Sequence, residues 1–191
     1  YRPNLFLRVT ACASPERISV LIERLRARSL GPTIVYVTLQ KTAEYVAATL
    51  LAAGFTAEAY HAGMEAEVRE AVQNRFMASD RAIVVATIAF GMGIDKANIR
   101  AVFHYNLPKS VENYAQEIGR AGRDGGPAET LTLYGPEDIR LRRAQIDEGL
   151  APVERRAADH GRLNALLGLA EALICRRQTL LAYFDETTQP C

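Results

Sequence analysis

A pair of arginines set among glycines, within residues 116–125, has the composition of a polyphosphate site. Arg120 and Arg123 are three residues apart, so at a helix end their side chains would project from one face. Gly119 and Gly122 remove bulk beside them, and guanidinium groups stay charged and bind phosphate oxygens bidentately. An ordinary helix end with solvated arginines fits the same pattern, so both interpretations stay open.

A glycine loop after a buried strand, within residues 83–95, offers a second kind of site. Ligands of parallel sheets bind beyond the carboxyl ends of the strands. Gly91 and Gly93 let a ligand approach the backbone closely, and Asp95 could accept a hydrogen bond from a ribose hydroxyl. A tight turn is the alternative explanation.

A third loop, at residues 59–64, also follows a strand pattern and contains His61. Its imidazole could bind a phosphate, although a lone histidine is more often a structural hydrogen-bonding residue. All three segments are predicted at loops or helix ends around one sheet, which favours a shared ligand-binding role.

Alternating strand and helix patterns position these segments. Residues 14–25, 43–51, 65–77 and 110–120 have helical spacing, with Ser14 expected as N-cap and Pro15 as the first helical residue. Short β-branched or apolar runs predict strands at residues 33–37, 56–60, 82–86, 101–105 and 130–134. This order predicts an α/β fold, a mostly parallel sheet with helices on both faces.

The strand patterns stop after residue 134. Residues 136–147, 152–173 and 175–184 read as helices, so we expect one domain at residues 1–135 and a helical segment at residues 136–191.

Composition narrows the class of protein. The 191 residues carry 23 basic and 22 acidic side chains, a net charge of +1, which excludes a simple polybasic tail but not a local basic face. No apolar run reaches the ~20 residues of a membrane span, and the start is not typical of a signal peptide, so we expect an intracellular fragment or processed chain. Three widely spaced cysteines favour a reducing compartment, the cytoplasm or the nucleus.

Taken together, the motifs resemble a known family. YHAG at residues 60–63, VVAT followed by AFGMGID within 84–95, and QEIGRAGRDG at 116–125 closely resemble the second RecA-like lobe of RecQ-family DNA helicases of superfamily 2. RPNL at residues 2–5 resembles the family's lead into that lobe, and CRR with LL and YF at 175–184 resembles the start of its zinc-binding module. The resemblance implies a RecA-like fold followed by a truncated zinc module.

The resemblance also implies roles within an ATP-dependent 3′-to-5′ DNA helicase. Mg²⁺-ATP would be held by the first RecA-like lobe, and Arg123 would be the arginine finger at its γ-phosphate. The partner would be single-stranded and partly duplex DNA. The implied supporting residues are Arg120 and Gln116 in catalysis, Asp95, Gly93 and Gly91 at the nucleotide, and His61, Thr87 and the backbone near Thr38 at the DNA phosphates.

One motif departs from the family pattern, and two motifs needed for ATP hydrolysis are missing from the sequence. Residues 37–41 lack the usual Ser-Arg pair, and Lys41 is the available substitute. The chain has no GxxxxGK[ST] phosphate loop and no acidic box, so we expect no ATP hydrolysis by this chain alone. A non-catalytic nucleic-acid-binding module, or an RNA helicase of the same superfamily, are the alternatives.

The cysteines of the tail carry the metal prediction. Spacing alone favours Cys175 as a buried apolar residue and Cys191 as an incidental terminal residue. By resemblance, Cys175 and Cys191 are the first two zinc ligands, with two more beyond residue 191, so Zn²⁺ is expected in the full-length protein only.

Overall fold

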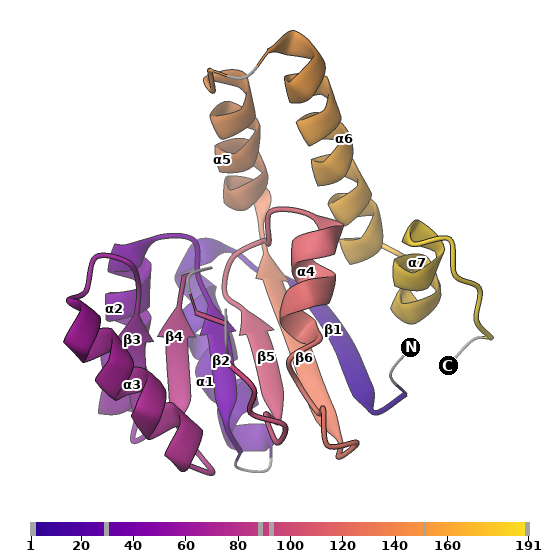
Figure 1. Cartoon of the computed structure of the whole chain (residues 1–191). Coiled ribbons are helices and arrows are strands. Elements are labelled where there is room, and N and C mark those ends of the chain that lie inside the picture. Colours follow the sequence, from indigo (N-terminus) through magenta and orange to yellow (C-terminus); the bar gives the residue numbers. More distant parts are fainter. Residues whose placement is uncertain (1–2, 29–30, 88–89, 92–93, 151, 190–191) are drawn as a thin grey trace.

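Six parallel strands form one sheet at the centre of the molecule (Figure 1). The computed structural model describes residues 3–28, 31–87, 90–91, 94–150 and 152–189. The strand order is β1-β6-β5-β2-β4-β3, and every neighbouring pair is parallel. The strands are β1 (Leu5–Ala11), β2 (Thr33–Tyr36), β3 (Ala57–Tyr60), β4 (Ile83–Ala86), β5 (Ala101–His104) and β6 (Ala128–Tyr134). The predicted α/β class with a mostly parallel sheet is confirmed.

Helices cover both faces of this sheet, as the buried character of the central strands requires. One face carries α1 (Arg17–Ala27) and α2 (Gln40–Ala52), whose apolar residues pack on Val35 and Val85. The other face carries α3 (Ala66–Ala78) and α4 (Val111–Ile118), which pack on Ile34 and Val84. The connection from β4 to β5 adds Phe90 to this second core.

Three helices follow the sheet: α5 (Pro136–Asp147), α6 (Val153–Ala170) and α7 (Arg176–Tyr183). Figure 1 shows α5 and α6 standing side by side above the end of β6, with α7 beside the start of the chain. Leu163, Leu166 and Leu180 from α6 and α7 join the core on the α4 face. The helical segment is therefore packed onto the sheet domain through a shared apolar core.

Two local predictions are wrong, each for an identifiable reason. Ser14 is not the N-cap of an α-helix, because residues Ser14–Glu16 form a 3₁₀ turn closed by the bond from the Glu16 N–H to the Ala13 carbonyl, and α1 begins at Arg17. The edge strand β1 is not among the predicted strands, because its apolar run covers only Leu5–Leu7 before Arg8, and every second side chain is exposed.

Among the described residues, no helix has the length and apolar character needed to cross a bilayer.

Candidate functional site

The strand register places several loops at one edge of the sheet. Tyr36, the last residue of β2, is aligned with Ala86 of β4 and with His104 of β5, and Tyr60 of β3 is aligned with Ala86 as well. The loops that follow these strands therefore begin at the same level, as the positions of parallel strand ends predict.

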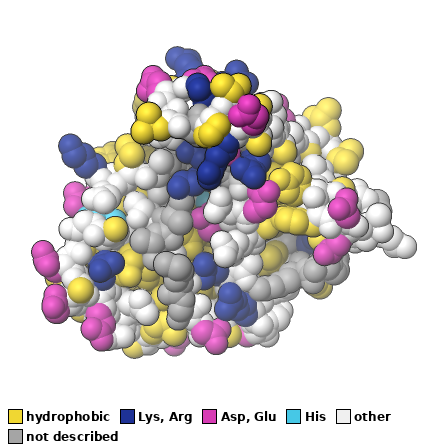
Figure 2. All heavy atoms as spheres, turned by 45° about the horizontal axis from the view of Figure 1, so that its top comes forward, with side chains coloured by type: hydrophobic (Ala, Val, Ile, Leu, Met, Phe, Trp, Pro, Cys, Tyr) yellow, Lys and Arg dark blue, Asp and Glu magenta, His cyan; other side chains and the backbone are white. Residues whose placement is uncertain are grey.

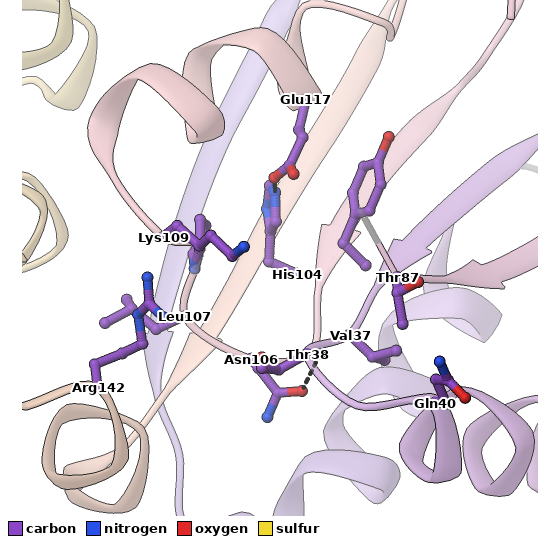
Figure 3. Close-up of a pocket in the computed structure, with 12 residues that line it drawn as sticks. Val37, Thr38, Gln40, Thr87, His104, Asn106, Leu107, Lys109, Glu117 and Arg142 are labelled. Carbon is purple, nitrogen blue, oxygen red and sulfur yellow. Dashed lines mark hydrogen bonds and ion pairs between the residues drawn. The ribbon is translucent and has the colours of Figure 1, made fainter. Parts of the chain in front are cut away.

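A cavity of about 280 Å³ opens at this edge. Figure 3 shows Thr38, Gln40 and Thr87 along one part of its wall and Lys109 and Arg142 on another. Its lining is completed by Tyr36, Val37, His104, Asn106, Leu107, Pro108 and Glu117. The cavity thus combines hydroxyl and amide groups with two cationic side chains and one carboxylate, Glu117, which is buried against His104.

The two cations come from different parts of the fold. Lys109 lies exposed in the loop before α4, and Arg142 projects from α5. Burial lowers the pKa of Arg142, the charge of Asp159 opposes this, and an arginine so far above neutrality stays protonated. Figure 2 shows lysine and arginine side chains gathered near the centre of this face. The cavity therefore suits an anion.

Two of the three predicted DNA residues lie at this cavity. Thr38 is exposed, and its backbone N–H donates to Asn106 Oδ1 at 3.2 Å. Thr87 is half-buried, and its backbone N–H donates to the carbonyl of Tyr60 at 3.2 Å. Their loops are thus held at the strand ends while the cavity stays open between them.

The third predicted DNA residue, His61, is turned into the protein. Its side chain is 6% exposed, and Nε2 lies 3.2 Å from Glu44 Oε1. Nδ1 is buried and has no hydrogen-bond partner within the described residues. In this structure His61 therefore contacts α2 and does not line the cavity.

The predicted nucleotide residues form a second cluster, centred on Arg120. The helix α4 ends at Ile118, so Arg120 and Arg123 lie in the turns after it and not in its last turn. Arg120 Nη1 donates to the Gly91 carbonyl at 2.5 Å, and its Nε is buried with no hydrogen-bond partner in the described part of the chain. Gly91 has φ 137°, and a Cβ there would lie 2.5 Å from Arg120 Cζ.

Arg123 and Asp95 meet in the same cluster. Arg123 Nη1 lies 3.2 Å from Asp95 Oδ1, and the side chains are 37% and 89% exposed. Both are therefore accessible to a ligand, and the guanidinium already binds a carboxylate. Gln116 is exposed on α4 one turn before Arg120, and the predicted Gly93 lies outside the described residues.

Two neighbours of this cluster were not predicted. Asn4 Nδ2 donates to the carbonyls of Gly122 and Gly126, each at 2.8 Å, and so fixes the turn that carries Arg123. Tyr36 Oη donates to the Phe90 carbonyl at 3.1 Å. Burial raises the pKa of Tyr36 far above its usual value, so this hydroxyl stays neutral and able to donate.

Sequence reasoning also missed Asn106, Lys109 and Arg142 at the cavity. The first two follow β5 directly, so the rule that ligands bind beyond strand ends could have found them. Arg142 lies on a helix 38 residues after His104, and no local pattern places it at the sheet edge.

The described residues do not complete a zinc site. No group of three or more histidine, cysteine or carboxylate side chains in the described ranges could hold a metal. Cys175 is half-buried just before α7, and Cys191 lies outside the described residues. Cys12 is buried far upstream, and burial raises the pKa of its thiol. Cys175 is thus the one predicted ligand that the described part contains, whereas a structural zinc needs four ligands.

Comparisons with known proteins decide the family. Residues 16–125 match the helicase conserved C-terminal domain, and residues 136–191 match the RecQ zinc-binding family. The chain belongs to the helicase C-terminal domain family, in its RecQ branch. The ATP-dependent DNA helicase RecQ of Haemophilus influenzae is 45% identical over 192 residues, 100% of this chain and 30% of that protein. The RecQ-like DNA helicase blm-1 of Caenorhabditis elegans is 42% identical over 188 residues, 97% of this chain and 19% of that protein.

Solved structures show that the fold of this RecQ-type lobe is shared more widely. The C-terminal domain of the DEAD-box protein Dbp5 superposes with a TM-score of 0.60 at 21% identity, over 78% of this chain and 86% of that chain. Escherichia coli SrmB, a DEAD-box protein solved with regulator of ribonuclease activity A, superposes with a TM-score of 0.63 at 22% identity. This match covers 80% of this chain and 89% of that chain. Both likenesses concern the fold. The chain spans less than a third of the length of the curated relatives named above.

Proposed function

We propose that this RecQ-type lobe is the second motor lobe of an ATP-dependent 3′-to-5′ DNA helicase. Its substrates are ATP with Mg²⁺, bound together with a first RecA-like lobe of the same polypeptide, and single-stranded or partly duplex DNA. Its place of action is then the bacterial nucleoid or the nucleus. The relatives' printed activities and the geometry of the two clusters support this proposal.

One observation carries the proposal more than any other. The arginine turn and the glycine loop lie about 30 residues apart in sequence, yet Arg120 contacts Gly91 and Arg123 contacts Asp95. A structural helix end needs neither contact. The convergence leaves two guanidiniums, which donate to phosphate oxygens, beside one exposed carboxylate, which can accept from a ribose hydroxyl. This combination suits a nucleoside triphosphate.

On the nucleotide side, Arg123 is the proposed finger. It is accessible and can exchange the Asp95 carboxylate for a phosphate oxygen, since both are bound by the same guanidinium geometry. Arg120 has an unsatisfied buried N–H and keeps the glycine loop in place, with Gln116 in a supporting role. A finger of this kind stabilises charge in the transition state and accelerates phosphoryl transfer by about 10³ to 10⁵.

On the DNA side, the cavity is the proposed track for the strand. Thr38 and Thr87 offer hydroxyl groups, and Lys109 and Arg142 offer charge, all of which bind phosphates without reading bases. We propose that His61 supports this edge indirectly through Glu44, because its ring is buried.

The two segments of the chain have separate proposed roles. Residues 1–135 form the motor lobe, and residues 136–191 begin a zinc-binding module. Cys175 would be its first ligand and Cys191 its second, and the metal would supply folding free energy for the tail.

A salt titration tests the DNA half of the proposal. Affinity of the intact protein for a labelled single strand should fall steeply with salt and differ little between unrelated sequences, because phosphate contacts dominate. Thr87→Val should weaken binding by about fivefold on every sequence, the worth of one hydrogen bond. Val68→Thr, on the exposed surface of α3 away from the cavity, is the control. A strong sequence preference would contradict the proposed track.

A further inference from the structure

The backbone N–H of Thr38 is not open to a ligand. It donates to Asn106 Oδ1 at 3.2 Å across the mouth of the cavity, as Figure 3 shows. Thr38 itself is exposed, so without this bond its backbone N–H would be open to solvent or to a ligand.

The orientation of the Asn106 amide is fixed from its other end. Asn106 Nδ2 donates to Asp138 Oδ1 at 3.2 Å, and a carboxylate accepts hydrogen bonds and does not donate them. The amide nitrogen must therefore face Asp138, which leaves the amide oxygen to face Thr38. A reversed amide would place its oxygen against the carboxylate.

Asp138 is fixed in turn by a buried arginine. Arg17 Nη1 lies 3.0 Å from Asp138 Oδ1 and Nη2 lies 2.5 Å from Oδ2, a bidentate pair in which the side chains are 1% and 8% exposed. The Gly135 N–H donates to Asp138 Oδ2 at 2.9 Å. Arg17 also donates to the Cys12 and Tyr105 carbonyls. A buried pair with this many partners has one arrangement.

We infer that Asn106 is a positioning residue for the strand contact at Thr38, oriented by the buried Asp138–Arg17 pair. The inference rests on the proposed function, since it concerns the DNA track. Its chain of contacts begins in α1, passes through the first turn of α5, and ends at the loop after β2. The helical segment at residues 136–191 thereby sets the geometry of a strand contact in the sheet domain.

The position of Asn106 distinguishes it from a mere surface residue. It is half-buried, and its two bonds join the loops after β2 and β5 to α5. Without the amide, the Thr38 loop keeps its covalent place but loses the bond that selects one arrangement. The hydroxyl of Thr38 would then meet a phosphate in fewer of its conformations, and affinity would fall without loss of the fold.

The test combines hydrogen exchange with a double-mutant cycle in the intact protein. In the wild type, exchange of the Thr38 amide should be slow despite its exposure, and Asn106→Ala should accelerate it by about fivefold or more. Asn98→Ala is the matched control, because Asn98 also donates to an aspartate, Asp80, away from the cavity. A fast Thr38 amide in the wild type would overturn the inference even if Asn106→Ala does not fold.

Binding of a fluorescent oligo-deoxythymidine supplies the second readout. Asn106→Ala should weaken binding by about fivefold, with no further loss in a Thr38→Val background but the full loss in a Thr87→Val background. Equal losses in both backgrounds, or none in either, would overturn the inference. Failure of the proposed function is separate: the wild type would then not bind the oligonucleotide, and hydrogen exchange alone would decide whether Asn106 positions Thr38.

Discussion

At the scale of single residues, the nucleotide cluster depends on the absence of a side chain at residue 91. Gly91 has φ 137°, which residues with a Cβ rarely adopt, and the Arg120 guanidinium occupies the space where that Cβ would stand. We therefore expect Gly91→Ala to displace Arg120, to strain the loop by about 1–3 kcal/mol and to lower ATP turnover. Calorimetry and steady-state hydrolysis measure the two effects.

A glycine in a different environment provides the control. Gly168 lies within α6, and an added Cβ there would contact nothing within 4 Å. Gly168→Ala should stabilise the helix by about 1 kcal/mol and leave turnover unchanged. If Gly91→Ala left ATP turnover unchanged as this control should, the contact between Arg120 and the glycine loop would not contribute to ATP hydrolysis.

At the scale of elements, the sequence predicted the strands and helices whose apolar residues form a continuous run or recur at helical spacing. Buried strands such as β2 and β4 have continuous apolar runs, and α5 was predicted with the bounds the structure has. β1 was missed because its apolar run is short and is followed by the polar residues Arg8 and Thr10, and the N-cap at Ser14 was wrong because its turn closes as 3₁₀.

The residues of the candidate site also fall into those that the sequence predicted and those that it did not. The assignment of Thr38 and Thr87 to the DNA came from the family resemblance, and both residues line the cavity at the sheet edge. The contribution of Arg142 depends on how α5 folds back over that edge, and the bond of Asn106 to Asp138 joins residues 32 apart, which local patterns do not specify.

One contact between elements gives a pH-dependent prediction. Tyr183 on α7 donates to Glu112 on α4 at 2.7 Å. Hydrogen bonds from Ser110 and Tyr183 lower the pKa of Glu112 below the ordinary value of a glutamate. A depressed carboxyl pKa stabilises the fold above the unfolded pKa, and this contribution is lost as pH falls through the folded pKa.

Tyr183→Phe should therefore lower the free energy of unfolding at pH 7 by about 0.5 kcal/mol, a small value because solvent screens the pair. In urea titrations, the difference from wild type should shrink as pH falls below the ordinary glutamate pKa of about 4.3 and through the lower pKa of Glu112 in the folded protein. Tyr45→Phe, at an exposed position on α2, is the control. A difference that persists unchanged at acid pH would rule out Glu112 as the partner that matters.

At the scale of the whole molecule, the two clusters share one helix. Glu117 of α4 lies 2.8 Å from His104 Nε2 at the floor of the cavity, and Arg120 follows α4 on the way to the nucleotide cluster. The His104 and Glu117 side chains are 1% and 8% exposed, so the link is buried. The helix α4 therefore joins the cavity and the nucleotide cluster through one rigid element.

The arginine finger is the central claim, and one measurement tests it most directly. DNA-stimulated ATP hydrolysis and ATP affinity are compared in the intact protein for wild type, Arg123→Ala and Arg75→Ala. Arg75 on α3 is an exposed arginine that pairs with Glu58 on β3, outside both clusters, which makes it the matched control. Arg123→Ala should reduce turnover by about 10³ or more with ATP affinity nearly unchanged, because the finger acts on the transition state. Retention of more than about a tenth of wild-type turnover would contradict the account, since a finger contributes far more than tenfold.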